Sequence, residues 1–281
     1  MLKNKLKSNA KKIDLFLKNY LKTQKKSSLI TPMNFGVLSG GKKIRSSIIL
    51  ASGKLFNIKS NRLINICGAV ECIHSYSLIH DDLPCMDNDK LRRGKPTAHI
   101  KFGESTAVLA GNSLLTLAFE MISDKKFKIK DNKKVLLIKK LAECSGHTGI
   151  AGGQELDLKY EKKRKKFKEI INMQRKKTGK LFSFCCFAAG QIAGKSKKAN
   201  NKLIKLGEDI GLLFQLADDF LDIKGKLKYT GKMVNKDKKK GKSTIINLLF
   251  VFLSFPAIWP AAKQQKLNNF PVFLLCIFII S

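Results

Sequence analysis

Acidic residues are scarce in this chain. Its 281 residues include 21 Asp and Glu against 55 Lys and Arg, which gives a formal net charge of +34. Three explanations compete: nucleic-acid binding, attraction to an anionic membrane, and a lysine-rich composition without a binding role. The lysines are spread over nearly every polar stretch rather than gathered on one face or in one tail. This spread favours the third explanation, so we expect no nucleic-acid partner.

Paired cysteine motifs and a leader sequence are also lacking. The 7 cysteines are odd in number and form no CxxC pair, and most lie among apolar residues, so we expect small core side chains in a reducing compartment. They are Cys67, Cys72, Cys85, Cys144, Cys185, Cys186 and Cys276. The basic N-terminus forms no signal-peptide core, because Asp14 and Lys18 interrupt the apolar residues around Phe16. We expect a cytoplasmic protein.

Alternation of apolar and polar residues, the pattern of strands, is not sustained anywhere in the chain. Apolar residues recur instead at helical spacing, and with 44% hydrophobic residues the chain can bury a large core. The pattern predicts an all-α, single-domain helical bundle. Helices are expected at about residues 13–21, 42–56, 61–81, 105–122, 132–149, 167–193 and 199–223. Between them we expect a turn around residues 31–36, a connection at residues 152–154 and a lysine-rich loop over residues 224–242.

Some of the few acids form two short stretches, His80 to Asp87 and Gln215 to Asp222, each at the end of an apolar run. Pro84 is expected to end or bend the first helix close to Asp81 and Asp82, where the helix dipole disfavours anions. Carboxylates that cluster in an apolar setting need a counter-charge. For oxygen ligands alone the natural one is Mg²⁺, completed by phosphate oxygens. A pair of solvated helix ends is the alternative, which the presence of two such stretches disfavours.

Helical geometry places acids of each stretch on one face. At about 100° per residue, Gln215, Asp218 and Asp222 lie on the same side of their helix. His74 and Asp81 are two turns apart and also share a face. Two helices would thus present carboxylates across one central cavity.

Basic residues suited to phosphate accompany these acids. Lys42 and Arg45 lie at the start of a helix directly after two glycines, where the backbone can approach an anion and free N–H groups can face it. Arg92 and Arg93 follow Asp87 in a loop, and the planar fork of arginine binds phosphate oxygens bidentately. This arrangement fits a diphosphate that bridges metal ions and guanidinium groups. A solvated turn and a structural Arg–Asp salt bridge are the alternatives.

The run from Gly40 to His99, above all the stretches from Glu71 to Pro84 and from Leu91 to Thr97, resembles the trans-isoprenyl diphosphate synthases. It is most similar to the bacterial farnesyl diphosphate synthases. The resemblance covers roughly residues 10–249. It continues through Gly152 to Leu158, Lys177-Thr178-Gly179, the second acidic stretch and Gly241 to Thr244.

The resemblance implies a role for each matching residue. Asp81, Asp87 and Asp218 would bind Mg²⁺, supported by Asp82 and Asp222. The groups for the allylic diphosphate would be Arg92, Lys177, Thr178, Gln215, Lys232 and, as a further candidate, Lys242. The groups for isopentenyl diphosphate would be Lys42, Arg45, His74 and Arg93. It also implies a homodimer whose substrates are small-molecule diphosphates.

The chemistry that this family implies needs no protein nucleophile. The allylic C–O bond would ionise to a carbocation, the isopentenyl double bond would attack it, and a proton would be lost. Tyr76 and Ser77 would lie about 6–8 Å below the metals and face the growing chain. Tyr76 would then form a floor that stops elongation at farnesyl length; a plain core aromatic is the alternative.

Other functions stay open. A geranyl or geranylgeranyl diphosphate synthase is the runner-up, whereas a terpene cyclase would not need the second diphosphate site. From a different class, the chain would be a degenerate, inactive, lysine-rich relative that binds membrane or nucleic acid. An inactive relative is disfavoured because both acidic stretches and the pair Lys177-Thr178 are intact.

The resemblance fails after Leu249. Residues 250–260 and 270–280 are apolar almost all round, and the chain has no acid after Asp237. Neither stretch reaches the roughly 20 residues that a membrane-spanning helix needs, so we expect no stable membrane insertion. We therefore divide the chain into a synthase domain, residues 1–249, and an atypical tail, residues 250–281. A reading-frame change, a degenerate end and a membrane-surface anchor are the competing explanations of the tail.

Overall fold

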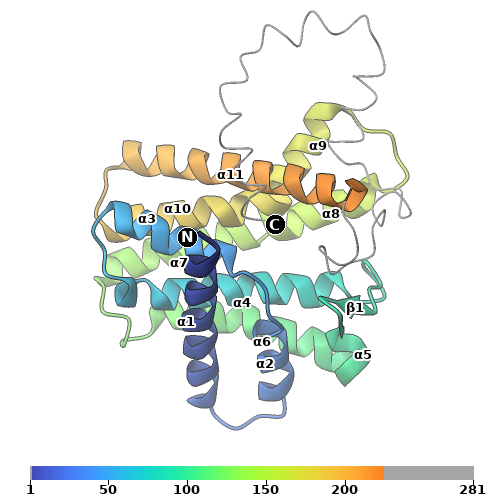
Figure 1. The fold of residues 1–281 in the computed structure, drawn as a ribbon, viewed down its shortest axis with the longest axis horizontal. Helices are drawn as coiled ribbons and strands as arrows, with labels where there is room; N and C mark the ends of the chain where they lie inside the picture. Colours follow the sequence, from blue (N-terminus) through green and yellow to red (C-terminus); the bar gives the residue numbers. More distant parts are fainter. Residues whose placement is uncertain (1, 225–281) are drawn as a thin grey trace, which may run out of the picture.

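The backbone of residues 2–224 and the side chains of residues 2–219 are described in a computed structural model. This part of the chain is built almost entirely of helices, which confirms the all-α prediction (Figure 1). The predicted domain boundary at residue 249, the tail, Lys232 and Lys242 lie outside the described residues.

The elements follow one another as a series of helices with one short hairpin. The first half comprises α1 (Leu2–Lys22), α2 (Ile30–Val37), α3 (Ile44–Leu55), the 3₁₀ turn η1 (Ser60–Arg62), α4 (Ile64–Asp81), β1 (Leu91–Arg92), β2 (Lys95–Pro96), α5 (Ala98–Phe102) and α6 (Glu104–Ser123). The second half comprises α7 (Asp131–Ser145), α8 (Ile150–Tyr160), α9 (Phe167–Gln174), the π-helical turn η2 (Arg175–Gly179), α10 (Lys180–Ile192) and α11 (Lys197–Lys224).

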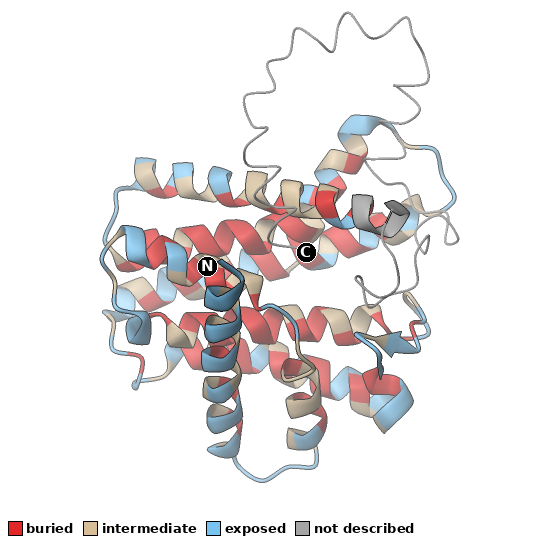
Figure 2. Cartoon of the chain, in the orientation of Figure 1, coloured by how far each residue is buried: buried red, intermediate tan, exposed pale blue. Residues whose placement is uncertain are grey.

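Helix α4 lies at the centre of the bundle and is buried along most of its length (Figure 2). A helix that is apolar on all sides belongs in the interior. It packs closely against α6, because Gly111 has no side chain: a Cβ there would lie 2.2 Å from Nε2 of His80. This contact fixes the end of α4 that carries the first acidic stretch.

Helices α10 and α11 form the second close pair (Figure 1). Gly207 on α11 faces the α10 backbone, and a Cβ at this position would lie 2.4 Å from Cα of Ser183. Gly211 makes a similar approach, with Cα of Gly179 at 2.6 Å from its added Cβ. The second acidic stretch is therefore held against η2 by backbone-to-backbone packing.

Several local predictions were wrong. Residues 31–36 form α2 rather than a turn, because Pro32 lies in its first turn, where no backbone N–H is needed. The helix expected over residues 132–149 ends at Ser145, and the connection expected at residues 152–154 lies inside α8. The glycines of this segment permit close backbone contact, since a Cβ on Gly153 would lie 2.2 Å from N of Lys177. The loop after the first acidic stretch contains the hairpin β1–β2.

Within the described residues, helix α6 is the one helix that is long and apolar enough to cross a membrane, judged by its length and composition alone; its mean hydropathy is 1.3. Core helices of water-soluble proteins meet the same criteria. The inward face of α6 packs in the core through Leu114, Leu117 and Met121.

Candidate active site

The first acidic stretch folds back onto the end of α4. Helix α4 ends at Asp81, as Pro84 predicts. The backbone N–H of Asp87 donates to the carbonyl of Asp81 at 2.8 Å, and that of Asp89 donates to the carbonyl of Asp82 at 3.1 Å. These bonds satisfy helix-end carbonyls and bring the first-stretch acids close together.

Asp82 is buried and binds Arg92. Nε of Arg92 donates to both carboxylate oxygens, at 2.9 and 2.8 Å, and Nη2 donates to Oδ1 at 2.5 Å. Burial disfavours the Arg92 cation, but the hydrogen bonds to Asp82 together with the charges of Asp82, Asp81 and Asp89 outweigh burial and raise the pKa of Arg92. This is the Arg–Asp salt bridge that the sequence left open as an alternative, and it holds Arg92 at the edge of the acidic group.

Among the described residues, Asp81 has no hydrogen-bonded or ion-paired partner comparable to Arg92. Burial raises the pKa of its carboxyl to about 6, and the neighbouring charges of Asp87 and Asp82 add to this shift. The cations of Lys177 and Arg92 act in the opposite direction without cancelling it. Within the part of the chain that the structure describes, the positive charges near Asp81 are therefore too weak to offset its burial.

The π-helical turn η2 brings Lys177 and Thr178 toward α8 and α11. Nζ of Lys177 donates to Oδ2 of Asp157 at 2.5 Å. Thr178 donates from Oγ1 to Oε1 of Gln215 at 3.0 Å, and Nε2 of Gln215 donates to Oδ1 of Asp219 at 2.8 Å. The structure thus joins Lys177, Thr178 and Gln215, three predicted site residues from different parts of the sequence.

The two neighbouring acids of α11 have different environments. Asp219 is buried beside Gln215, whereas Asp218 is exposed. The charge of Asp218 reaches Arg45, whose pKa it tends to raise. Asp222 belongs to α11, but its side chain lies outside the described residues.

A positive group lies beside the acids. Nη1 of Arg93 donates to Oγ of Ser39 at 3.3 Å and to the carbonyl of Gly40. Gly41 has φ 105°, a backbone conformation that favours glycine, and a Cβ there would lie 2.8 Å from Cζ of Arg93. The guanidinium carbon of Arg45 lies 4.8 Å from the centre of the Phe182 ring.

The charged forms of these basic side chains are destabilised by burial and by neighbouring cations. Burial lowers the pKa of Arg45 and of Arg93, and Arg92 lowers that of Arg93 further. Burial and then the charge of Lys3 lower the pKa of Lys42. The pKa of His74 lies well below its ordinary value because of burial and the cations of Arg45 and Arg93. An anion bound here would relieve this repulsion.

Tyr76 and Ser77 lie on α4, before Asp81. Tyr76 is 8% exposed, its hydroxyl donates to the carbonyl of Ser145 at 3.3 Å, and its ring meets that of His80 edge-on. Burial and the charge of Asp81 raise its pKa to about 12. Oγ of Ser77 donates to the carbonyl of His74 at 3.0 Å. Tyr76 is therefore a buried side chain whose hydroxyl stays protonated and which interacts with the charge of Asp81.

The carboxylates of the described residues fit Mg²⁺ only if oxygens of a bound phosphate complete its coordination shell. Among the described residues, no three His, Cys, Asp or Glu side chains form a group that could hold a metal ion. Mg²⁺ commonly takes only one or two carboxylates when phosphate oxygens complete its shell. The raised pKa of Asp81 is the feature of this structure that a divalent cation would reverse.

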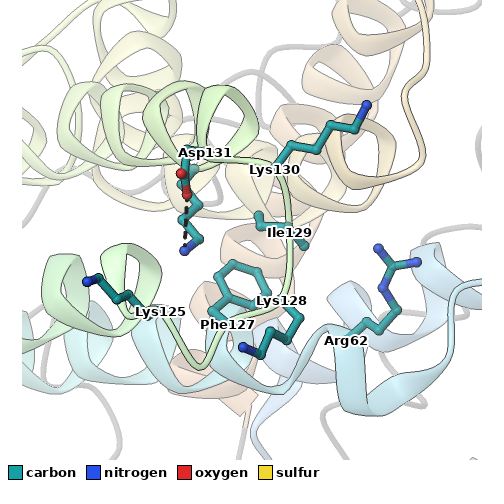
Figure 3. A pocket seen from close by; sticks show the side chains of 8 residues that line it. Arg62, Lys125, Phe127, Lys128, Ile129, Lys130 and Asp131 are labelled. Carbon is teal, nitrogen blue, oxygen red and sulfur yellow. Dashed lines mark ion pairs between the residues drawn. The ribbon is translucent and has the colours of Figure 1, made fainter.

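A surface hollow of about 590 Å³ lies at the other end of α4 (Figure 3). It is lined by Arg62, Lys125, Phe127, Lys128, Ile129, Lys130, Asp131 and Lys134. Arg62 precedes the first residue of α4 and Asp81 is its last, so this hollow is separate from the acidic stretches. None of its lining residues was predicted to be functional.

Sequence reasoning missed four buried residues around the site. They are Lys43, Glu71, Asp157 and Asp219. Asp157 had a usable signal, since it lies one turn after Gln154 in a stretch that resembles the family. The burial of Lys43 had none, because it stands beside Lys42 in a lysine-rich chain.

Comparison with known proteins agrees with this geometry. The polyprenyl synthetase family model matches residues 26–260. The farnesyl diphosphate synthase of Escherichia coli is 44% identical over 223 residues, which cover 79% of this chain and 75% of that protein. An FPP/GFPP synthase structure from Zymomonas mobilis has a TM-score of 0.77 and 34% identity, covering 100% of this chain and 99% of that one. A geranyltransferase from Helicobacter pylori, complexed with magnesium and isoprenyl diphosphate, has a TM-score of 0.77 and 29% identity, covering 98% and 94%.

The lowered pKa of His74 predicts a pH-dependent stability. The unfolded chain takes up a proton on this imidazole near pH 6.5, while burial and the neighbouring arginines keep the folded imidazole neutral. The unfolded state therefore binds more protons, so this contribution is present above about pH 6.5 and is lost as the pH falls below it. Between about pH 7 and 5.5, the free energy of unfolding should fall by about 1 kcal/mol more in the wild type than in His74→Gln.

Urea denaturation of the metal-free protein measures this difference. His147→Gln is the matched control, because His147 is exposed. Parallel pH profiles of the wild type and His74→Gln would contradict the assignment.

Proposed function

Because this chain belongs to the polyprenyl synthetase family and is an isoprenyl diphosphate synthase, we propose that it joins isopentenyl diphosphate to dimethylallyl and geranyl diphosphate and releases farnesyl diphosphate. The observation that carries the proposal is unfavourable charge of both signs along α4: the acid Asp81 at its C-terminal end, and Arg45 and Arg93 near His74. Asp81 has a pKa raised by burial, while Arg45 and Arg93 have lowered ones. A magnesium–diphosphate complex satisfies charges of both signs at once. The activity is assigned to residues 1–249, in the cytoplasm.

The acids would hold the metal and the basic groups the two substrates. Asp81, Asp87 and Asp218 would bind Mg²⁺, with Asp82 acting through Arg92 and Asp222 in support. Bound Mg²⁺ supplies positive charge that stabilises a departing pyrophosphate.

Residues of β1, η2 and α11 would hold the allylic substrate. Arg92 and Lys177 would bind oxygens of the allylic diphosphate and favour scission of its C–O bond, with the electron pair leaving on pyrophosphate. Thr178 and Gln215 would orient the same substrate through the hydrogen bond that they share. Lys232 and Lys242 are further proposed contacts.

The second substrate would occupy the positive cluster. Lys42, Arg45 and Arg93 would bind the diphosphate of isopentenyl diphosphate, and the neutral His74 would add a hydrogen bond. The alkene then attacks the allylic cation, and the proton that is lost would go to pyrophosphate. The groups on both sides are held by packed helices, which favours a fixed approach of the two carbon atoms.

The first test is release of pyrophosphate from geranyl and isopentenyl diphosphate. The wild type should be active with Mg²⁺ and inactive with EDTA. Asp81→Asn and Asp218→Asn should each lower kcat by about a hundredfold or more, because charge stabilisation at the leaving group is lost. Asp131→Asn is the matched control, because Asp131 is an exposed acid at the start of α7.

A wild type that turns over no diphosphate would instead support the degenerate, lysine-rich relative. Wild-type rates in Asp81→Asn would refute the metal assignment.

The second test concerns product length. Tyr76 precedes Asp81 by five residues on α4, about 7 Å along the helix axis, with Ser77 one residue nearer. Removing the ring in Tyr76→Ala should open this space and shift the product from farnesyl toward geranylgeranyl diphosphate. Chromatography of the dephosphorylated products measures the shift.

Tyr76→Phe is the matched control, since it keeps the ring and loses only the hydrogen bond to Ser145. Unchanged product length in Tyr76→Ala would refute the floor. A wild type that stops at geranyl or geranylgeranyl diphosphate would refute the farnesyl assignment.

We also propose a homodimer. Ile100, Val108 and Leu109 expose apolar surface on α5 and α6, between 37% and 52% of each residue. Sedimentation velocity should give twice the chain mass of 31.5 kDa, and Leu109→Lys should shift the protein to monomers, since it buries a charge in the interface. Leu55→Lys is the control, because Leu55 is also exposed but lies at the end of another helix, α3. A monomeric wild type would contradict the proposal.

A further inference from the structure

Lys43 is buried although it carries a charge, and it stands between two proposed substrate ligands. It is 6% exposed and occupies the N-cap position of α3, next to Lys42 and two residues before Arg45. The N-terminus of a helix disfavours cations, and burial of an unpaired ammonium group is strongly unfavourable. Lys43 therefore depends on its partners.

Three oxygens from separate elements surround the ammonium group. Nζ donates to the carbonyl of Val37 at 2.6 Å, at the end of α2. Oδ1 of Asp14 on α1 lies at 3.4 Å, and Oε2 of Glu71 on α4 lies at 3.8 Å. One side chain thus ties the beginning of α3 to α1, α2 and α4.

The backbone at this point is held in an unfavourable conformation. Lys43 has φ 46° and ψ 48°, the left-handed region that side chains with a Cβ rarely adopt. Gly40 and Gly41 precede it with φ of 91° and 105°. A turn of this kind persists only when surrounding contacts hold it.

Glu71 connects the same turn to the central helix. It is 3% exposed, and its Oε1 accepts hydrogen bonds from Oγ of Ser46 at 2.7 Å and from the Ser46 backbone N–H at 3.4 Å. Glu71 therefore caps the first turn of α3 from α4 and pairs with Lys43 as well. The partners of Lys43 hold both the turn, which carries Lys42, and the first turn of α3, which carries Arg45.

We infer that Lys43 is a positioning residue for the isopentenyl diphosphate site: its buried ammonium group holds the left-handed turn that directs Lys42 and Arg45. The inference rests on the proposed function. It assigns to Lys43 no contact with substrate. Its loss misplaces the diphosphate ligands of α3 and leaves the allylic site on η2 and α11 in place.

Lys43→Met tests the inference through the two Michaelis constants. KM for isopentenyl diphosphate should rise about tenfold, while KM for geranyl diphosphate stays within about twofold, because only the ligands on α3 shift. The dissociation constant for isopentenyl diphosphate, measured by calorimetry without the second substrate, should rise by the same factor. Lys54→Met, an exposed lysine on the same helix, is the matched control.

Two further variants separate positioning from folding. Lys43→Met removes one counter-charge of the buried Glu71, which keeps its hydrogen bonds from Ser46. Lys43→Met with Glu71→Gln should therefore recover part of the lost melting temperature yet keep the raised KM. Lys43→Gly relaxes the left-handed backbone but removes the anchor, and should also keep the raised KM.

The possible failures are distinguishable. Return of KM to the wild-type value in the double variant, or an equal change for both substrates, would overturn the positioning role. Absence of turnover in the wild type would overturn the proposed function alone, since the calorimetric comparison needs no reaction. An unchanged dissociation constant in Lys43→Met would overturn the inference directly.

Discussion

The charge at the C-terminal end of α4 is the constraint on which the rest of the site depends. Two adjacent carboxylates lie where the helix dipole opposes them and where burial penalises ionisation. The fold satisfies one of them internally, since Asp82 binds the Arg92 fork. Asp81 is left with more distant cations and has a pKa raised to about 6. The difference between the two adjacent carboxylates is thus that Asp82 binds Arg92 and Asp81 does not.

The basic side of the site shows the opposite imbalance. Arg45 and Arg93 lie close enough to His74 to lower its pKa, and burial lowers their own. Glycines permit the close contacts on both sides of the site. Gly111 holds the end of α4 against α6, and Gly41 admits the Arg93 guanidinium group. A rigid scaffold that keeps unfavourable charge in place is what an ion-bridged ligand site requires.

The sequence was informative where one local rule decided the outcome. Pro84 correctly predicted the end of α4. Helical spacing placed Gln215 on one face with Asp218 and Asp222, but the hydrogen bond of Gln215 is to Asp219, while Asp218 is exposed. The sequence failed where tertiary contact decided. The glycines around residue 153 suggest a break between helices, but they lie inside α8 because the η2 backbone passes beside them. The π-helical turn itself has no local signal, since the apolar spacing of residues 167–193 reads as one helix.

The same limit explains why Lys177 was identified only through the family resemblance and why Lys43 was missed. In a chain with 55 basic residues, a further lysine carries almost no information, whereas each of the 21 acids carries much more. Glu71 and Asp157 are buried acids, and each lies close to one lysine, at 3.8 and 2.5 Å. Both of these lysines lie in unusual backbone, a left-handed turn and a π-helical turn, next to proposed diphosphate ligands. A buried acid needs a partner of opposite charge. The buried acids Glu71 and Asp157 therefore identify Lys43 and Lys177 as the lysines, among many, that have a defined structural role.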